Sequence, residues 1–549
     1  MKKKLLALLL VLAMLLPGCA KNYADPQVDV TTMVEEKRNL FQTLGPVSFG
    51  DMEYVRPDPE GLTAAIEEAT AQFPGQDFDA AYEVFDSIYN QVLEYATMDT
   101  IAMIRYYQNM SDAALQEESE FCDTGYTDVS TAFDTYCDLI ADSDLKATFE
   151  SEEYYGEGFF DGYGSDSLDL SLAKEQFARQ TDLEAQYNRI MASASTDAYG
   201  DYTGQDLEDI AEIYVELIQV RNEIASIYGY DSFESYACEN IYDRDYDSAE
   251  TQVFLQGIKD HIVPVFDRLC GSYYAYSINF TACDEEDMLN YASSAAKAMG
   301  GEVLEGWKFM TENGLCDLSY SDNKYNGSFE TFLYTYEVPF VFVNPTGSLG
   351  DELTTVHEFG HFLQDYIWTG EHGANIDVAE IFSQSLEYLS LDYADITSRQ
   401  RENMLAYQLM SCVNVYIQQA AFYEFEQQAY RLPESERNVQ GLNTLFARIM
   451  AEYHITDYYS ISDAFWAQIP HLFSSPYYVI SYCTSIDAAV QVFEYQVNTG
   501  EGLELYLDLM YESDQPLLVM LETCGLESPF TADRMEHAAA FLEEQIFDN

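Results

Sequence analysis

Apolar residues recur at every third or fourth position along most of this chain, which is the spacing of amphipathic α-helices. Ser111-Asp112 directly precedes one such stretch and is expected to provide its N-cap. Gly229 follows another and predicts its end, because glycine readily takes the left-handed conformation that terminates helices. We therefore expect a mainly α-helical fold. The stretches with helical spacing are residues 61–150, 170–194 and 207–228 and most of the chain after residue 350.

The pattern changes between residues 316 and 350. Residues 328–336 alternate loosely between apolar and polar, and residues 338–343 form a continuous run of Val, Pro and Phe. Runs of β-branched and aromatic residues of this length are typical of strands. A small β-sheet is therefore expected just before the next helix. The strand near residues 338–344 is expected to be an edge strand that could pair with an extended peptide.

Charge limits the partners of the protein. The formal charge is −71, from 25 Lys and Arg against 96 Asp and Glu. Such a surface repels nucleic acid and anionic lipid, so we expect no nucleic-acid partner. It suits cationic ligands, although solvation of the surface explains it equally well. Hydrophobic residues make up 48% of the 549 residues, which indicates a globular protein with room for two or more domains.

The N-terminus has the features of an export signal. The basic segment Lys2–Lys4 precedes an apolar run over residues 5–16 that is too short to span a bilayer comfortably. Residues 16–19, Leu-Pro-Gly-Cys, resemble the lipobox of bacterial lipoproteins, in which the Cys receives a lipid. We expect the protein to be exported and anchored through a lipid on Cys19 to the outer face of the bacterial cytoplasmic membrane. Simple secretion is the alternative.

The cysteine count permits disulfides without requiring them. Ten Cys residues become nine when Cys19 is set aside, and an odd number cannot pair completely. Cys122 with Cys137, and Cys270 with Cys283, are the pairs closest in sequence. Buried free thiols are an equally good interpretation.

One stretch carries the chemistry of a metal site. His357, Glu358 and His361 form an H-E-x-x-H pattern, and Gly350 with Asp351 offers a helix break and an N-cap before it. Residues four apart on a helix lie one turn above each other on the same face, so both imidazoles can bind one ion. The nearby carboxylate can reach a water molecule at that ion. This arrangement suits one Zn²⁺ with an open position for water.

Zinc needs a third protein ligand, and several downstream residues qualify. A His six residues after His361 would indicate the metzincin class, but that position is Ile367. Glu380 and Glu387 are seven apart and share one face of a helix expected over residues 377–389. One carboxylate could bind the metal while the other orients a ligating His. Alternatively, both are surface carboxylates of an amphipathic helix. The candidates are Glu371, His372, Asp377, Glu380 and Glu387.

The stretch HEFGHFLQDY, followed by AEIFSQSLEYL, resembles the zinc peptidases of the M3 family, the thimet oligopeptidase and oligoendopeptidase F group. Residues 316–361, and the stretches that begin at Met98 and Arg221, are also similar to this family, so the resemblance covers most of the chain. It implies that Glu380 is the third ligand. It also implies two helical halves around a deep substrate channel. The segment before Glu380 is shorter than is usual in the family, which leaves Glu371 or His372 as a minor alternative.

A third group of residues lies near the C-terminus. His471, Tyr478 and Tyr482 follow Pro470 with a spacing that resembles the family's H-x-x-x-x-(P)-F-Y-x-x-x-Y segment. The resemblance implies that these side chains line the active site and bind the substrate and the developing oxyanion. A neutral O–H donor aimed at an oxyanion is chemically suited to that task. The alternative is that they are ordinary aromatic core residues, since the chain has 45 Tyr.

Together these features predict a zinc-dependent oligopeptidase that cleaves short unfolded peptides internally and acts as a monomer. Glu358 is expected to activate the attacking water. A peptide-binding lipoprotein that no longer cleaves is one alternative, which the intact Glu358 argues against. A zinc carboxypeptidase on a related helical fold is another. We expect a signal peptide over residues 1–18, a tether over 19–60, an N-terminal helical region over 61–200 and a catalytic region over 201–549.

Overall fold

The structure, a computed structural model, describes residues 44–548 except 152, 157, 161, 165–169, 195, 197–201, 273–277, 279–281 and 369–374. In this part of the chain, residues 170–281 and 374–548 form one compact unit, here called the helical unit. Residues 44–169 and 282–373 form a second, here called the sheet unit. These units group the chain by contacts, whereas the expected regions divide it in sequential order, so the boundary near residue 200 stays a prediction. The expected signal peptide over residues 1–18 and Cys19 lie outside the described residues, so both stay predictions.

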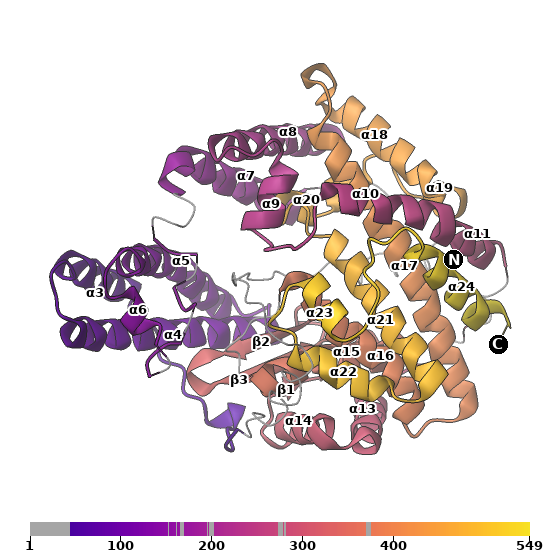
Figure 1. The fold of residues 1–549 in the computed structure, drawn as a ribbon, viewed down its shortest axis with the longest axis horizontal. Coiled ribbons are helices and arrows are strands. Elements are labelled where there is room, and N and C mark those ends of the chain that lie inside the picture. Colours follow the sequence, from indigo (N-terminus) through magenta and orange to yellow (C-terminus); the bar gives the residue numbers. More distant parts are fainter. Residues whose placement is uncertain are drawn as a thin grey trace. The chain divides into compact units, whose positions relative to one another are not determined.

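The sheet unit combines helices with one small sheet (Figure 1). Its helices are α3 (Pro59–Gln72), α4 (Phe78–Gln108), α5 (Ala113–Ala141), α6 (Lys146–Phe149), α13 (Glu285–Met299), α14 (Gly301–Glu312) and α15 (Gly350–Trp368). Its strands are β1 (Cys316–Asp317), β2 (Ser328–Leu333) and β3 (Val338–Val343).

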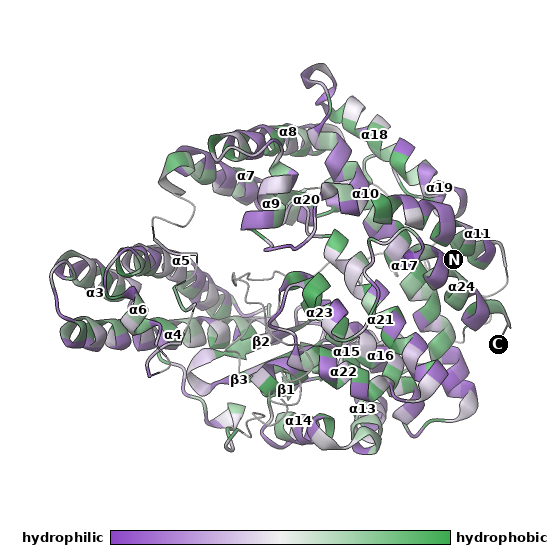
Figure 2. Ribbon diagram, viewed as in Figure 1, coloured by the Kyte–Doolittle hydropathy of each residue, from purple (hydrophilic) through white to green (hydrophobic). Residues whose placement is uncertain are grey.

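Helices α3, α4 and α5 confirm the helical pattern expected over residues 61–150. Of the expected Ser111-Asp112 pair, Asp112 is the N-cap of α5, since its side chain accepts from the backbone N–H of Ala114 at 2.9 Å. The apolar stripes meet in a shared core, where the Phe85 ring lies 5.7 Å from that of Phe133 and 5.5 Å from that of Phe149. Apolar and polar residues alternate along these helices (Figure 2). Burial of the apolar stripes against one another therefore stabilises this part of the unit.

The sheet confirms the expected change of pattern but not the expected edge. Its strand order is β1-β3-β2, with β3 antiparallel to β2 and parallel to β1. Strand β3 is thus the central strand, and the prediction that residues 338–344 form an edge strand is wrong. The six residues of β3 are all buried, which explains their continuous apolar run. Among the described residues, β2 is the longer of the two edge strands.

The helical unit contains the remaining helices of the part that the structure describes (Figure 1). In its first segment these are α7 (Lys174–Ser193), α8 (Gly204–Ile227), α9 (Phe233–Asn240), α10 (Ser248–Gly257) and α11 (Val263–Gly271). In its second segment they are α16 (Ile376–Tyr393), α17 (Ser398–Tyr430), α18 (Val439–Glu452), α19 (Ile455–Tyr458), α20 (His471–Ser474), α21 (Ile480–Thr499), α22 (Gly502–Tyr511), α23 (Leu517–Thr523) and α24 (Arg534–Glu543).

Helix α8 ends as the sequence predicted. Its last residue is Ile227, and Gly229 has a φ of +85°, in the left-handed region. The backbone N–H of Tyr230 then donates to the carbonyl of Ala225 at 2.9 Å, which satisfies an acceptor of the last turn. Across the part of the chain that the structure describes, no helix is long and apolar enough to cross a membrane.

None of the nine described cysteines is in a disulfide, so the candidate pairs are wrong within this structure. Cys122 and Cys137 lie on the same helix, α5, and both are buried. Fifteen helical residues span roughly 22 Å, which is too far for a bridge. Cys270 and Cys283 are free thiols as well.

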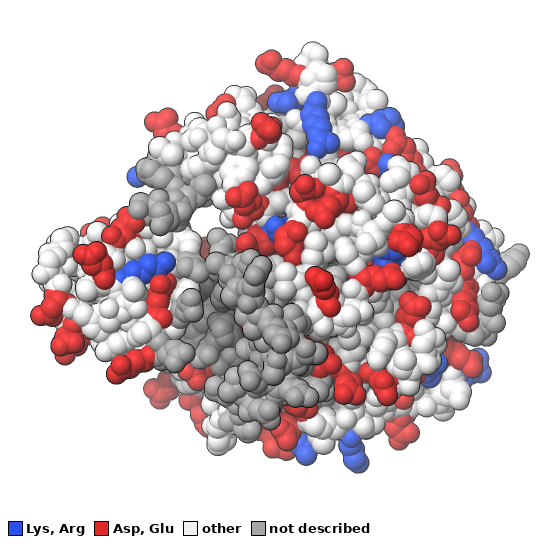
Figure 3. All heavy atoms as spheres, in the orientation of Figure 1, with Lys and Arg blue, Asp and Glu red and all other residues white. Residues whose placement is uncertain are grey.

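Acidic side chains dominate the charged groups on the face shown in Figure 3, where basic side chains are few and scattered. This distribution agrees with the 96 Asp and Glu against 25 Lys and Arg in the sequence. The visible acidic groups spread over many elements, so the charge is a general property of this face.

Candidate metal centre

At the start of helix α15, the side chain of Asp351 accepts hydrogen bonds from the backbone of the preceding turn. Its carboxylate accepts from the backbone N–H of Thr346 at 3.0 Å, Gly347 at 2.6 Å and Ser348 at 2.8 Å. The helix starts at Gly350, so Asp351 lies in the first turn and is not the expected N-cap residue. The carboxylate still binds the loop to the helix, because it reaches backwards over the turn.

The H-E-x-x-H residues lie on α15 as the spacing predicted. The rings of His357 and His361 follow one another by one helical turn, with centroids 5.1 Å apart. Glu358 is 3% exposed and His361 is 9% exposed, while His357 is half-buried. One helix therefore presents two imidazoles and a buried carboxylate without help from a second element.

Close packing fixes the position of α15 within the sheet unit. It contacts β2, β3, α13 and α14. The Trp307 ring of α14 meets that of Phe359 edge-on with centroids 5.1 Å apart. A Cβ added at Gly306 would lie only 2.7 Å from Cδ1 of Leu363, so α14 can approach this closely because residue 306 is glycine.

A buried lysine braces the loop that precedes β2. Lys324 is 6% exposed, and its Nζ donates to Oδ1 of Asp317 at 2.9 Å, to the carbonyl of Ser319 at 2.7 Å and to the carbonyl of Val343 at 2.9 Å. Asp317 and Lys324 are among the residues that resemble the M3 pattern. Their contacts tie the loop to the C-terminal end of β3, which contacts α15.

Glu380 lies on the first turns of α16 in the helical unit, at 4% exposure. Its Oε2 accepts a hydrogen bond from Oγ of Ser383 at 3.0 Å. This contact limits the rotation of the carboxylate. Glu387 is half-buried on the same helix, and its expected role in orienting a ligand stays a prediction.

His471, Tyr478 and Tyr482 form one cluster in the helical unit. The ring centroid of Tyr478 lies 5.3 Å from that of His471 and 5.2 Å from that of Tyr482. The Tyr482 hydroxyl lies 3.5 Å from Nε2 of His471, which is long for a hydrogen bond. All three side chains are buried, so the cluster is a defined group rather than a set of scattered aromatic residues.

The environment keeps this cluster uncharged at neutral pH. Burial lowers the pKa of His471 to about 4, so its imidazole is neutral. Burial and the negative charge of Glu380 raise the pKa of Tyr482 above its usual range. Burial, Tyr482 and Glu380 act in the same way on the pKa of Tyr478. Glu380 is therefore close enough to influence both hydroxyls, which remain protonated hydrogen-bond donors.

Among the described residues, His357, His361 and Glu380 are the group that together could hold a metal ion. Two ring nitrogens and one carboxylate oxygen form a donor set that fits Zn²⁺ with a fourth position open. The alternative ligands Glu371 and His372 lie outside the described residues.

Sequence reasoning missed Glu330, which feels the charge of Glu358, and its acidic neighbour Asp365. Glu330 is on β2, and Asp365 follows His361 by one turn of α15. Burial, with the charges of Asp365 and Glu358, raises the pKa of Glu330 well above its usual value. Burial raises the pKa of Asp365 to about 7. The spacing of seven between Glu358 and Asp365 was the signal that could have identified the second residue.

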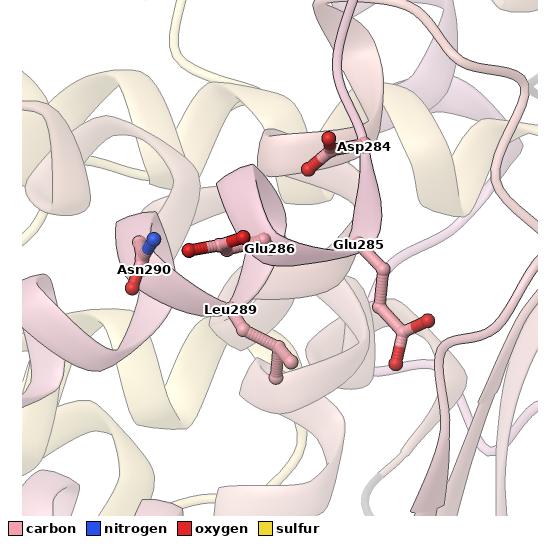
Figure 4. A pocket seen from close by; sticks show the side chains of 5 residues that line it. All are labelled: Asp284, Glu285, Glu286, Leu289 and Asn290. Carbon is pink, nitrogen blue, oxygen red and sulfur yellow. The ribbon is translucent and has the colours of Figure 1, made fainter.

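A cavity of about 520 Å³ lies elsewhere, at the start of α13. Figure 4 shows Asp284, Glu285 and Glu286 there, with Leu289 and Asn290. Asp284 caps α13, and acidic residues in a first turn stabilise a helix through its dipole. Local helix stability thus explains these acidic side chains, and no predicted site residue lines the cavity.

Two family models match this chain. One, described as Peptidase family M3, matches residues 301–536, and the other, described as Peptidase M3 N-terminal domain, matches residues 49–165. The two matches together cover more than half of the chain.

The chain is also similar to two oligopeptidases in sequence and to a solved peptidase structure in fold. The chain is 24% identical over 404 residues to oligoendopeptidase F, chromosomal, of Lactococcus lactis subsp. cremoris, a match that covers 66% of this chain and 64% of the relative. It is 25% identical over 276 residues to oligopeptidase PepF of Bacillus subtilis (strain 168), covering 48% of this chain and 41% of that protein. The matches thus span less than two thirds of either relative. The solved structure titled PZ peptidase A with inhibitor 2 shares the fold, with a TM-score of 0.74 at 21% identity over 91% of this chain and 99% of that one.

Proposed function

The chain belongs to peptidase family M3, and from this premise we propose that it is a zinc-dependent oligopeptidase that hydrolyses short, unfolded peptides. The observation that carries the proposal is the face of α15 on which His357 and His361 lie one turn apart, with the buried carboxylate of Glu358 between them in sequence. Binding alone does not require that carboxylate, whereas hydrolysis needs a base beside the attacking water.

We assign the metal ligands to His357, His361 and Glu380. The donor set supports this assignment, and the hydrogen bond from Ser383 supports an oriented Glu380 carboxylate. When bound, zinc supplies a Lewis acid for the scissile carbonyl and lowers the pKa of a water molecule.

The other residues act on protons and on developing charge. Glu358 accepts the proton of the attacking water at its carboxylate and passes it to the leaving amine. Tyr482, with Tyr478 and His471, donates hydrogen bonds to the carbonyl oxygen as that atom becomes negative. Their neutral state under physiological conditions supports this role, because a neutral O–H donor gives up no proton before the reaction.

The substrate is a peptide in extended form. The main chain of the peptide pairs with the edge strand β2, because β3 is the central strand and is already paired on both sides. Such pairing recognises the backbone and selects only weakly among side chains.

The test combines metal analysis with peptide cleavage. We expect about one zinc ion per chain, cleavage of internally quenched peptides, loss of cleavage after chelation and recovery with added zinc. Mass analysis of the products from a mixed peptide library separates internal cleavage from the strictly terminal cleavage of a carboxypeptidase. A chain that binds zinc and peptides but leaves every peptide intact would show a binding protein instead.

We also propose export and a lipid anchor on Cys19, on the strength of the basic, apolar and lipobox-like segments that begin the sequence. The full chain, expressed in a bacterium, should partition into detergent, and Cys19→Ala should release it or block processing. Unchanged partitioning of Cys19→Ala would contradict the anchor.

A further inference from the structure

The segment Tyr242–Tyr246 joins α9 to α10 in the helical unit and contacts three elements that carry candidate site residues. These elements are α16 with Glu380, α21 with Tyr482, and the loop from α20 to α21 with Tyr478. The family pattern that suggested those site residues gave no reason to single out this segment.

Arg244 joins the segment to α16 and α21 at once. Its Nε donates to Oδ2 of Asp377 at 3.0 Å, and its Nη2 donates to Oγ of Ser481 at 3.0 Å. The Ser481 hydroxyl in turn donates to Oδ1 of Asp377. The side chains of Arg244 and Asp377 are 0% and 1% exposed, and Ser481 is fully buried. Three buried groups thus close a triangle between the two helices.

Asp377 and Ser481 each lie close in sequence to a candidate site residue. Asp377 precedes Glu380 by three residues on α16, which is one turn, so any rotation of this turn moves both. Ser481 is the neighbour of Tyr482 on α21. A change in the triangle therefore alters where the Glu380 carboxylate and the Tyr482 hydroxyl lie relative to each other.

Three further hydrogen bonds attach the segment to the loop before α21 and to the start of α16. The Tyr242 hydroxyl donates to the carbonyl of Pro476 at 2.7 Å. The side-chain amide of Asn375, the N-cap of α16, donates to the carbonyls of Tyr242 and Asp243 at 2.9 and 3.0 Å. Tyr477, next to Pro476, has a φ of +64°, a conformation that non-glycine residues rarely adopt. Contacts of this kind are needed where surrounding structure must hold a strained backbone in place.

Stability alone is a weak reason for such an arrangement. Removing two charges from water is costly, and apolar residues of similar volume often stabilise a core equally well. The buried pair of Arg244 and Asp377, with its several directional hydrogen bonds, instead fixes the geometry of the groups that it joins. The stacking of the Arg244 guanidinium 4.4 Å from the centroid of the Tyr242 ring restricts it further.

We propose that the Tyr242–Tyr246 segment is a positioning element for the metal centre. Through Asp377 and Ser481 it sets the Glu380 carboxylate against Tyr482, and through Pro476 it sets the loop that carries Tyr478. The proposal rests on the proposed function for the identity of the site. Arg244, Asp377, Ser481 and Tyr242 are positioning residues that act through the groups they hold.

Two serines of α21 give a matched test. Ser481 and Ser485 are both fully buried, and both donate to Asp377, Ser481 to its carboxylate and Ser485 to its backbone carbonyl at 2.9 Å. Ser481→Ala should weaken zinc binding about tenfold, measured by competition with a chelator, and lower kcat by about tenfold with KM unchanged. Ser485→Ala should change both quantities less than about twofold, because the triangle remains intact.

Two tyrosines of the segment give a second matched test. Tyr242 and Tyr246 are each 5% exposed, and the Tyr246 hydroxyl has no hydrogen-bond partner among the described residues. Tyr242→Phe should lower kcat several-fold and leave zinc affinity unchanged, since it removes only the hydroxyl, which bonds to the loop and to no residue beside a ligand. Tyr246→Phe should leave both unchanged.

The two readouts separate this proposal from the proposed function. If the wild-type chain binds zinc and cleaves no peptide, the proposed function fails, and the zinc affinities of the serine variants still test the positioning element. Melting followed by circular dichroism checks that each variant folds. Equal effects on zinc affinity and kcat within the serine pair and within the tyrosine pair would overturn the positioning role and leave only a structural one. A selective effect of Ser481→Ala on zinc affinity, or of Tyr242→Phe on kcat, supports it.

Discussion

The two groups of candidate site residues are built in different ways. His357, Glu358 and His361 lie within five residues of one helix, and the helical repeat alone sets their mutual geometry. The second group is spread over several elements of the helical unit: Glu380 on α16, His471 on α20, Tyr478 in the loop before α21 and Tyr482 on α21. Only the folded unit brings these residues together.

This difference predicts how each group responds to change. In the α15 group, the chemistry of each side chain decides the outcome, because the backbone that carries it is a single regular helix. In the Glu380 group, we expect the positioning residues to matter as well, since buried contacts from the Tyr242–Tyr246 segment hold the elements in place. Variants of the two groups can therefore be compared directly.

The largest expected effect is that of Glu358→Gln in the α15 group. The substitution removes the base and leaves the ligands, so zinc should stay stoichiometric while kcat falls on the order of 10⁴-fold. Glu352→Gln, in the first turn of the same helix, should leave kcat within about twofold of wild type. Steady-state kinetics and metal analysis check both, and a Glu358→Gln enzyme with near wild-type kcat would rule out this residue as the base.

Glu380→Ala tests whether Glu380 binds the same metal ion as the two histidines of the α15 group. Loss of a ligand should weaken zinc binding by more than about 100-fold, which exceeds the usual effect of changing a residue that only orients a ligand. Glu387→Ala, seven residues along the same helix, should weaken zinc less. Tight, stoichiometric zinc in folded Glu380→Ala would show that the third ligand is another residue, with Glu371 and His372 to be tested next.

Tyr482→Phe should lower kcat on the order of 10²-fold with little change in KM, because an oxyanion donor acts mainly on charge that develops in the transition state. Tyr478→Phe should have a smaller effect. Tyr506→Phe is the matched control, since Tyr506 is a buried tyrosine of the helical unit whose hydroxyl has no partner among the described residues. A folded Tyr482→Phe enzyme with wild-type kcat would show that Tyr482 only packs.

The smallest expected effect is on stability between pH 6 and 8. Burial, and to a lesser degree Asp123, raises the pKa of Asp99 in the sheet unit to about 7, and burial raises that of Glu426 in the helical unit to about 8. Such carboxyls contribute stability below their unfolded pKa, which is lost as pH rises through the folded pKa. The melting temperature should therefore fall by a few degrees from pH 6 to pH 8.

His471 contributes in the opposite direction, since its folded pKa of about 4 lies below the unfolded value. Its contribution to stability is lost as the pH falls below about 6.5 towards 4. Asp99→Asn and Glu426→Gln should each flatten the slope between pH 6 and 8, and the two variants compare the units. A slope that neither variant changes would contradict the assignment to these carboxyls.

The sequence by itself determined the features that depend on near neighbours. Apolar spacing predicted the helices around Phe85 and α8 with its end at Gly229, because one helical turn brings residues three and four apart together. The same repeat placed His357 and His361 on one face of α15. The run Val338–Val343 predicted a buried strand, although not its place in the sheet, since the residues of a central and an edge strand can have the same local pattern.

Only the tertiary structure decided the features that join distant parts of the chain. Arg244 meets Asp377 and Ser481 across 133 and 237 positions, and no local repeat links those residues. The cluster of His471, Tyr478 and Tyr482 beside Glu380 was suggested by resemblance, but its burial, and with it the neutral state of His471, depends on how α16 and α21 pack. Periodicity encodes which face of a helix is buried, whereas the partner that covers that face is chosen by the complementary shape and charge of the whole fold.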